Sequence, residues 1–388
     1  MRLILLKKAC FMRILIVVRK ITMGGLQKQA LSFAQTAHKN NHEVHLMILK
    51  SEKPHNELEI PSYITVHRPK ISSQLFSSFR GILSYITTYY FKRLFGCDVE
   101  FSLGYEYSRC FEKYVEEIER QYGGFDLIFF RGQGCFEYLH QFNRPNCYCF
   151  VDGKPYFYKN IFSKNANKII YGAPKKFICV SEQLKKFILE IEKSAQVICS
   201  HNFLDFAEIR TLAEKPVTGL PEKYIVNVGR LVSVKSQELL IKTMPLLPEE
   251  LSLVLVGDGK NRQNLQNLAR SCKCEKRVIF AGSQNNPYPY IKHAKALVHT
   301  SRKEGFGMIF LESLILDTPV VATESIGGMR DILKGDILEN QIVPRDPEAL
   351  AHKITDTINN PYRSTLDMYQ EYDSNVSFND LLERLKNF

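Results

Sequence analysis

Short, almost uninterrupted apolar runs recur along the first half of the chain. They occupy residues 12–18, 43–49, 125–130, 147–151 and 176–180. A strand buried on both faces of a parallel sheet has such a run, whereas a strand with one solvated face alternates apolar and polar positions. Helical or irregular stretches separate the runs, in the βα rhythm of a parallel sheet. We therefore expect an α/β domain with a doubly wound parallel sheet, beginning at residue 12 after an extension formed by residues 1–11.

The second half repeats the same pattern. Its apolar runs occupy residues 224–228, 253–256, 278–282, 296–301, 319–322 and 342–343. An apolar helix ending at Asp317 separates two of these runs, and the tail at residues 377–388 has the spacing of an amphipathic helix. With 388 residues the chain is too long for one ordinary core. The pattern thus predicts a second parallel-sheet domain of similar size.

The composition is that of an ordinary globular enzyme, with 45% hydrophobic and 24% charged residues. Lys7, Lys8 and Arg13 interrupt the apolar opening, so we do not expect a secretory signal. The chain has no run of 18 apolar residues, so we expect no membrane-spanning helix. The ten cysteines fit a reducing compartment, and the closest pairs are too tight for usual zinc spacings. We expect a cytoplasmic protein without a metal site.

The positive charge is concentrated in the first half. Residues 1–200 hold 29 Lys and Arg against 17 Asp and Glu, whereas residues 201–388 hold 23 against 24. Such asymmetry indicates that the first domain faces something anionic. No nucleic-acid-binding motif accompanies the charge, so we expect no nucleic acid. An anionic membrane surface is the preferred partner, with the protein peripheral on the inner face of the membrane.

One aromatic stretch in the basic half, residues 72–101, fits this membrane hypothesis. It is dense in Phe, Tyr, Leu and Ile, and its only cations are Arg80, Lys92 and Arg93. An amphipathic, weakly basic helix pair of this kind is typical of an interfacial membrane contact. The alternative is a core helix of the first domain followed by a loop on the acceptor side.

Residues 301–322 contain the most informative arrangement of side chains. Glu304 and Glu312 are separated by seven residues, and Gly305 and Gly307 between them make a helical Glu304 improbable. We expect Glu304 on a loop and Glu312 in the first turns of the following helix. Backbone N–H groups of Phe306, Gly307 and Met308 would then lie at the helix N-terminus, which favours an anionic ligand. Two surface glutamates on a solvated helix start are the simpler alternative.

Two further loops carry candidate phosphate-binding groups. Gly229, Arg230 and Lys235 follow the run at residues 224–228, and Arg and Lys there can meet negative charge on a diphosphate leaving group. Gly24 and Gly25 form a glycine turn that opens a helix after the first run. No GxGxxG fingerprint is present, which argues against a nicotinamide enzyme.

These motifs, in this order, resemble retaining glycosyltransferases of family 4, which have the GT-B fold of two Rossmann-like domains facing a cleft. EGFGMIFLE resembles the family's E-x7-E signature, VGRLVSVK its VGRL-x-x-x-K element, and GGLQKQAL its glycine loop. The resemblance implies that Arg230 and Lys235 hold the donor diphosphate in place of a metal. It also implies that Glu304 meets the hexose, Glu312 the nucleotide ribose, and the loop after Gly282 the base.

The resemblance also implies a domain division. Residues 12–200 would form the acceptor-binding domain and residues 201–370 the nucleotide-sugar-binding domain. Residues 371–388 would form a helix that crosses back and packs on the first domain. Family members often carry a histidine near the sugar after the fourth or fifth strand, where this chain has Asp152. We therefore include Asp152 among the candidate catalytic residues, with a helix or turn cap as its alternative role.

The expected activity is transfer of a hexose from a nucleotide diphosphate sugar, such as a UDP-sugar, to a hydroxyl of the acceptor. The acceptor would be a glycolipid or a surface glycan such as lipopolysaccharide core, and no cofactor beyond the nucleotide sugar is expected. Two alternatives stay open: a nucleotide-sugar epimerase of GT-B fold, and a non-catalytic nucleotide-sugar-binding subunit. Intact Arg230, Lys235, Glu304 and Glu312 argue against a silent protein.

Overall fold

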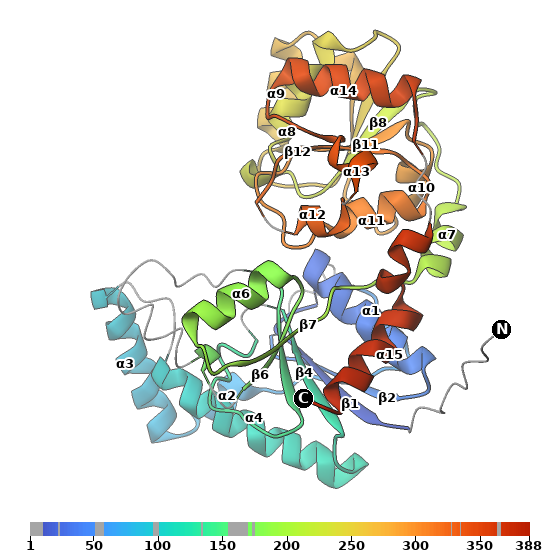
Figure 1. Ribbon diagram of the computed structural model, residues 1–388. Coiled ribbons are helices and arrows are strands. Elements are labelled where there is room, and N and C mark those ends of the chain that lie inside the picture. The colour runs from blue at the N-terminus through green and yellow to red at the C-terminus, as the bar shows by residue number, and fades with distance from the viewer. Residues whose placement is uncertain are drawn as a thin grey trace, which may run out of the picture. The chain divides into compact units, whose positions relative to one another are not determined.

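The computed structural model describes residues 11–21, 24–50, 58–95, 101–132, 135–153, 170–172, 175–326, 328–333, 335–362 and 366–388. The chain divides into two compact units. Unit 1 consists of Met1–Phe203 and Ser374–Phe388, and unit 2 of Leu204–Asp373. Each unit is a parallel sheet with helices on both faces (Figure 1).

The sheet of unit 1 has seven strands in the described residues, ordered β3-β2-β1-β4-β5-β6-β7 and all parallel. The five apolar runs of the first half form five of these strands, as predicted. The short edge strands β3 and β7 were not predicted. The strands are β1 (Arg13–Val18), β2 (Glu43–Ile48), β3 (Thr65–His67), β4 (Leu127–Arg131), β5 (Cys147–Val151), β6 (Lys176–Cys179) and β7 (Gln196–Cys199).

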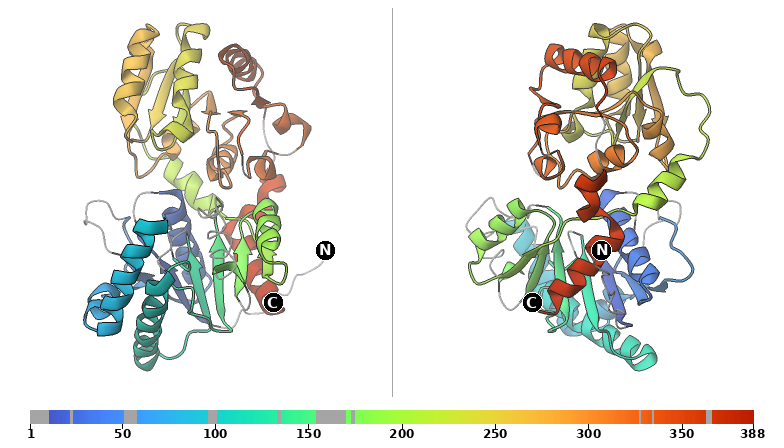
Figure 2. Two further views of the ribbon diagram at one scale, coloured as in Figure 1. Left: turned by 90° about the vertical axis from the view of Figure 1, so that its left-hand side faces the viewer. Right: turned by 45° about the vertical axis from the view of Figure 1, so that its right-hand side comes forward.

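Two neighbouring phenylalanines of β4 show how both faces of this sheet are covered. Successive side chains of a strand point to opposite faces. Phe129 packs against Phe33 of α1 (Gly25–Lys39), whereas Phe130 packs against Phe111 of α4 (Phe101–Tyr122). The C-terminal helix α15 (Ser374–Leu385) lies beside α1 (Figure 2), where Phe378 contacts Phe33. The other helices whose bounds lie within the described residues of unit 1 are α2 (Ile71–Phe76), α3 (Phe79–Phe95) and α6 (Glu182–Ile191).

The large apolar side chains described in α3, at residues 79–90, lie outside the core of unit 1, so the core-helix interpretation of the aromatic stretch is wrong for them. Phe79 is 80% exposed, Tyr90 58% and Tyr89 53%. Close contact with the end of α2 involves Gly81, where a Cβ would lie 2.0 Å from the carbonyl oxygen of Leu75. The predicted cations Lys92 and Arg93 have side chains outside the described part. Among the described residues, no helix combines the length and apolarity needed to cross a bilayer.

The sheet of unit 2 has six parallel strands in the described residues, ordered β10-β9-β8-β11-β12-β13. Each apolar run of the second half forms one of them, with ends that differ from the prediction by at most two residues. The strands are β8 (Tyr224–Val228), β9 (Ser252–Val256), β10 (Val278–Gly282), β11 (Ala296–His299), β12 (Val320–Thr323) and β13 (Ile342–Val343).

Alternation along these strands builds two separate hydrophobic clusters. Leu297 belongs to the cluster under α7, α10 and α11, and Val298, the next residue, to the cluster under α8, α9 and α14. Each strand is therefore buried on both faces, which explains its continuous apolar run. The helices of unit 2 are α7 (Phe206–Ala213), η2 (Ser233–Lys235), α8 (Gln237–Thr243), η3 (Met244–Leu246), α9 (Arg262–Ser271), η4 (Glu275–Arg277), α10 (Tyr288–Lys292), α11 (Met308–Ile315), α12 (Met329–Ile332), α13 (Asp336–Glu339), α14 (Pro347–Asn359) and η5 (Leu366–Tyr372).

Candidate active site

The site of unit 2 lies where the strand order reverses. From β8 the chain proceeds outward to β9 and β10, then returns to β11 on the other side of β8. Helices after β8 and β11 cover opposite faces, so the loops at the carboxyl ends of these strands diverge. Ligands of open α/β sheets bind in the crevice at such a switch point. Arg230 and Lys235 follow β8, and Glu304 follows β11.

Backbone hydrogen bonds fix the start of the loop after β8. The N–H of Gly229 donates to the oxygen of Val256 at 2.9 Å, and the N–H of Leu231 donates to that of Asp258 at 3.0 Å. Gly257 allows this close approach, because a Cβ there would lie 2.1 Å from the oxygen of Gly229. Between these anchors the Arg230 side chain is exposed, and no described residue pairs with its guanidinium. Arg230 is thus a cation available to a ligand.

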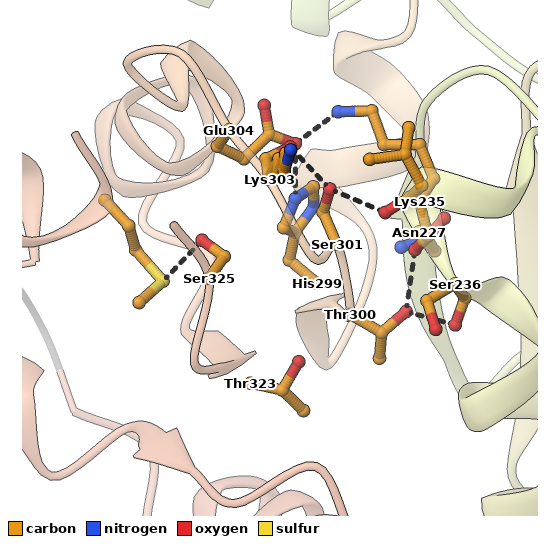
Figure 3. A network of polar contacts seen from close by, with 12 residues as sticks. Asn227, Lys235, Ser236, His299, Thr300, Ser301, Lys303, Glu304, Thr323 and Ser325 are labelled. Atoms are coloured by element: carbon orange, nitrogen blue, oxygen red, sulfur yellow. Dashed lines mark hydrogen bonds and ion pairs between the residues drawn. The ribbon is translucent and has the colours of Figure 1, made fainter. Parts of the chain in front are cut away.

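Lys235, Glu304 and His299 meet at one carboxylate oxygen. The Lys235 ammonium pairs with Oε1 of Glu304, and Nε2 of His299 lies 2.7 Å from the same oxygen (Figure 3). The Glu304 side chain is 12% exposed and that of His299 3%. The phenyl ring of Phe310 packs edge-on against the imidazole at 4.9 Å between centroids. The structure therefore brings together two of the predicted catalytic residues from loops 69 positions apart.

The partners of Glu304 keep it ionised. Burial alone would raise the pKa of this carboxyl group. The hydrogen bonds and electrostatic interactions with His299 and Lys235 outweigh burial and lower the pKa from 4.5 to about 2. A carboxylate at neutral pH can accept hydrogen bonds from sugar hydroxyls, or balance a cation, but it cannot act as a general acid.

Glu304 lies on a loop, as predicted, and α11 begins only at Met308. Gly307 caps the helix with a φ of +86°, a conformation that side chains rarely adopt, and a Cβ there would lie 2.7 Å from the Phe310 ring. The N–H groups of Gly307 and Met308 have no acceptor in the described part of the chain. Two backbone N–H donors at the N-terminus of α11 therefore follow Glu304 within four residues.

The remaining donor-site candidates of unit 2 differ in what they offer. The Phe306 ring is buried against Tyr372, with 5.7 Å between centroids, so only its backbone could meet a ligand. Gly305 accepts a 2.9 Å hydrogen bond from the N–H of Gly328, which holds the loop. Glu312 is half-buried in α11, as expected from the sequence. Gly282 ends β10 with a φ of +74° and opens the next loop.

Unit 1 holds the other predicted site residues. Gly24 is the N-cap of α1 and Gly25 its first residue, as the glycine-turn pattern predicts. Asp152 follows β5 and is buried, and its Oδ2 accepts a 3.2 Å hydrogen bond from the N–H of Gly132. Its Oδ1 is buried without a partner in the described part of the chain. Arg131, at the end of β4, is also buried and was not predicted as a site residue. Burial lowers the pKa of its guanidinium, and the nearby Asp152 offsets part of this lowering.

His299, which contacts Glu304, is a candidate-site residue of unit 2 that sequence reasoning missed. It was assigned only to the strand that leads to Glu304. Its signal is a titratable side chain at the end of an otherwise apolar strand, five residues before the acid. Its Nδ1 is buried without a partner among the described residues. In the part of the chain that the structure describes, no group of three or more His, Cys, Asp or Glu side chains is arranged to hold a metal ion.

Comparison with a family model finds a match that lies almost entirely in unit 2. Residues 208–376 match the family model described as glycosyl transferases group 1. A Campylobacter jejuni N-acetylgalactosamine-N,N'-diacetylbacillosaminyl-diphospho-undecaprenol 4-alpha-N-acetylgalactosaminyltransferase is 32% identical over 136 residues, or 35% of this chain and 37% of the relative. Lipopolysaccharide core biosynthesis glycosyltransferase LpsE of Rhizobium meliloti is 36% identical over 124 residues, or 32% and 34%. The chain thus matches about a third of the length of these curated relatives.

Comparison with solved structures covers both units. The structure of Anabaena Alr3699/HepE in complex with UDP and glucose superposes with a TM-score of 0.68 at 16% identity, covering 97% of this chain and all of the other. At this identity the likeness shows the fold alone. The chain therefore has the two-domain GT-B fold, and through residues 208–376 it is similar to the glycosyl transferases of group 1.

Proposed function

We propose that the protein is a retaining glycosyltransferase that moves a hexose from a nucleotide diphosphate sugar to a hydroxyl of a glycolipid or growing surface glycan. The observation that carries the proposal is the cluster at the β8/β11 switch point. There the cation of Lys235 and the ionised carboxylate of Glu304 form one pair, and the exposed cation of Arg230, which has no partner among the described residues, lies five positions before Lys235. Donor-type nucleotides bind such switch points in α/β sheets.

The leaving group of the reaction is a nucleoside diphosphate, on which negative charge grows as the bond from the sugar carbon to the phosphate oxygen breaks. Arg230 can bind phosphate oxygens in a bidentate fashion, and Lys235 can add a point charge. These fixed cations would stabilise the charge without a metal ion. Lys235 already faces an anion in the structure, the Glu304 carboxylate, so its ammonium is directed into the site.

The carboxylates would orient the donor rather than exchange protons with it. The low pKa of Glu304 suits acceptance of hydrogen bonds from hexose hydroxyls. Glu312, in α11, would meet the ribose, and the N–H groups of Gly307 and Met308 would meet an anionic part of the donor. The acceptor oxygen would form its bond to the sugar carbon on the face that the diphosphate leaves, and its proton would pass to the departing phosphate. The configuration at that carbon would then be retained.

The names of similar proteins support the substrate classes. Alr3699/HepE was crystallised with UDP and glucose, which favours a UDP-sugar as the donor. The names of the two curated relatives refer to a diphospho-undecaprenol acceptor and to lipopolysaccharide core. We infer a lipid-linked or surface-glycan acceptor for this chain from that shared chemistry.

An acceptor of this kind favours action at the inner face of the membrane. The large apolar side chains that the structure describes in α3, at residues 79–90, are exposed, and residues 1–200 carry twelve more basic than acidic residues. Apolar insertion and electrostatic attraction would thus act from the same unit, as in peripheral membrane proteins. The exposed cation Arg80 lies within this aromatic helix.

The decisive experiment offers the purified protein a panel of nucleoside diphosphate sugars, with and without lipid-linked acceptors, and measures nucleoside diphosphate release and the glycosidic product. Acceptor-dependent release with an α-configured product from an α-configured donor supports the proposal. Conversion of the donor into an epimer without acceptor would indicate the epimerase alternative. Donor binding without any turnover across the panel would indicate a non-catalytic binding subunit and contradict the proposal.

A further inference from the structure

Arg345 reaches from the edge of the sheet of unit 2 toward the centre of the site. It follows edge strand β13 and precedes α14. Its Nη1 donates to the carbonyl oxygens of Thr300 and Ser301 at 2.9 and 3.2 Å and to Oγ1 of Thr323 at 2.9 Å. Its Nη2 donates to Oγ of Ser236 at 2.7 Å. One guanidinium thus joins the carboxyl ends of β11 and β12 to the loop after β8.

Two of these contacts hold residues close in sequence to the Lys235–Glu304 pair: Ser236, which follows Lys235, and Ser301, three positions before Glu304. Ser236, directly after Lys235, has a φ of +54°, which is uncommon for a residue with a side chain. It is held there by Arg345 and by Thr300, whose Oγ1 donates to the carbonyl oxygen of Ser236 at 2.9 Å (Figure 3). Ser301 in turn donates to the carbonyl oxygen of Lys303, the residue before Glu304.

All four hydrogen-bond acceptors of the Arg345 guanidinium are neutral oxygen atoms. No carboxylate pairs with it in the part of the chain that the structure describes. Burial lowers the pKa of Arg345, and the more distant Glu238 offsets part of this lowering. A planar guanidinium presents its N–H groups in a fixed fork, so four acceptors, from the end of β12 and from the loops after β8 and β11, are held in one relative geometry. A lysine has three donors on a single atom and cannot reproduce this arrangement.

We propose that Arg345 is a positioning residue that sets the geometry of Lys235 against Glu304. The proposal rests on the proposed function, because it takes this pair to be part of the catalytic site. Arg345 acts through Ser236 on one side and through Thr300 and Ser301 on the other, and it does not itself touch the donor. A displacement of about 1 Å between such groups costs on the order of a hundredfold in rate.

Arg277 provides a matched control within the same unit. Like that of Arg345, its guanidinium donates to backbone carbonyl oxygens, here three, those of Leu247, Leu251 and Pro248, at 3.2, 3.1 and 2.7 Å. These carbonyls lie around the amino end of β9, away from the carboxyl ends that carry the site. Arg277→Lys and Arg345→Lys therefore remove the same kind of contact, and a purely structural role would give both variants the same phenotype.

The experiment compares wild type, Arg345→Lys and Arg277→Lys for turnover at saturating donor, for the KM of the donor and for Tm. It also records the imidazole ¹⁵N shifts of His299, assigned with His299→Gln, because that ring hydrogen-bonds to Glu304. We expect Arg345→Lys to lose turnover by about 10 to 100-fold, with a smaller change in KM. The His299 shifts should move in Arg345→Lys and stay unchanged in Arg277→Lys.

Equal turnover in the two variants, or unchanged His299 shifts in Arg345→Lys, overturns the positioning role. If the wild type turns over no donor, the proposed function fails, and the His299 shifts still decide the role of Arg345. If Arg345→Lys does not fold, Thr323→Val tests the same contact, since it removes one acceptor and keeps the side-chain shape. A shift of the His299 signals in Thr323→Val supports the proposal, and unchanged signals contradict it.

Discussion

His299 and Glu304 are joined by a 2.7 Å contact between Nε2 and the carboxylate oxygen that also receives the Lys235 ammonium. The strand that ends at His299 and the loop that carries Glu304 are thereby linked through one ionised group. Because the folded-state pKa of Glu304 is lowered from 4.5 to about 2, its contribution to stability depends on pH.

We expect the stability lost in Glu304→Gln to be largest above pH 5 and to shrink as the pH falls toward 3. A depressed carboxyl pKa contributes stability that is present above the unfolded-state value and is lost as pH falls through the folded-state value. The full contribution is on the order of 2 to 3 kcal/mol. Urea unfolding of both proteins at several pH values measures it. Glu214→Gln serves as the control, since Glu214 pairs with Lys292 but is 71% exposed. A difference that does not vary with pH would contradict the expectation.

Arg230→Ala and Lys235→Ala should each slow transfer by two to three orders of magnitude, equivalent to roughly 3 to 4 kcal/mol of lost charge stabilisation. The exposed guanidinium of Arg230 has no described partner, and Lys235 faces the site from the same loop. Steady-state release of nucleoside diphosphate at saturating donor is the measurement. Lys292→Ala, which removes another lysine–glutamate pair of unit 2, is the control and should retain wild-type turnover. Wild-type rates in Arg230→Ala or Lys235→Ala would remove them from the site.

Activity should survive EDTA. In the proposed mechanism Arg230 and Lys235 would supply fixed positive charge where other enzymes place a bridging Mg²⁺ or Mn²⁺. Donor turnover before and after exhaustive chelation, with metal added back, checks this. Loss of activity that metal restores would mean that these cations do not replace a metal ion.

Gly307→Ala should destabilise the protein more than Gly219→Ala does. Both glycines have positive φ, +86° and +77°, so each substitution imposes about 1 kcal/mol of backbone strain. At Gly219 a Cβ meets nothing within 4 Å, whereas at Gly307 it meets the buried Phe310 ring at 2.7 Å. The difference between the two free energies of unfolding isolates this clash. Equal losses would show that the ring moves away without cost.

The protein should bind anionic vesicles at low salt and be released at high salt. Each Lys or Arg near the bilayer contributes on the order of 1 kcal/mol, within a Debye length of about 8 to 10 Å. Co-sedimentation is the measurement, and Phe79→Ser combined with Tyr89→Ser and Tyr90→Ser should abolish pelleting, because these exposed side chains lie on α3.

Leu246→Ser is the control for vesicle binding, since Leu246 is 51% exposed but belongs to unit 2. It should pellet like the wild type. If the wild type stays in the supernatant with acidic vesicles at low ionic strength, the membrane hypothesis fails, and the glycosyltransferase proposal is unaffected.

The buried strands could be predicted from the sequence because burial on both faces leaves a local mark. Strands β5 and β10 have the predicted ends, residues 147–151 and 278–282. The edge strands β3 and β7 were not predicted, because they are short and partly exposed and therefore lack a long apolar run. The aromatic stretch leaves two interpretations open, because a dense apolar composition does not distinguish a core helix from an exposed one, and the described aromatic side chains of α3 are exposed.

The candidate site could be recognised in the sequence only where its residues lie in one loop. Glu304 with Gly307, and Arg230 with Lys235, stand close together in the sequence with recognisable spacing. The contributions of His299 and Arg345 arise from pairings between separate strands, and Arg345 lies 109 residues from Ser236, whose hydroxyl it binds. No local pattern records such a contact, because it depends on the order of strands in the sheet.

Helix α15 belongs to unit 1 although the whole of unit 2 precedes it in the chain. Phe378 packs against Phe33 and Phe203, and Leu381 and Leu385 lie in the same core. During synthesis the ribosome therefore releases all of unit 2 before the segment that completes unit 1. Until Ser374–Leu385 emerges, Phe33 and Phe203 lack their contact with Phe378. The hydrophobic core of unit 1 would therefore stay incomplete while unit 2 folds.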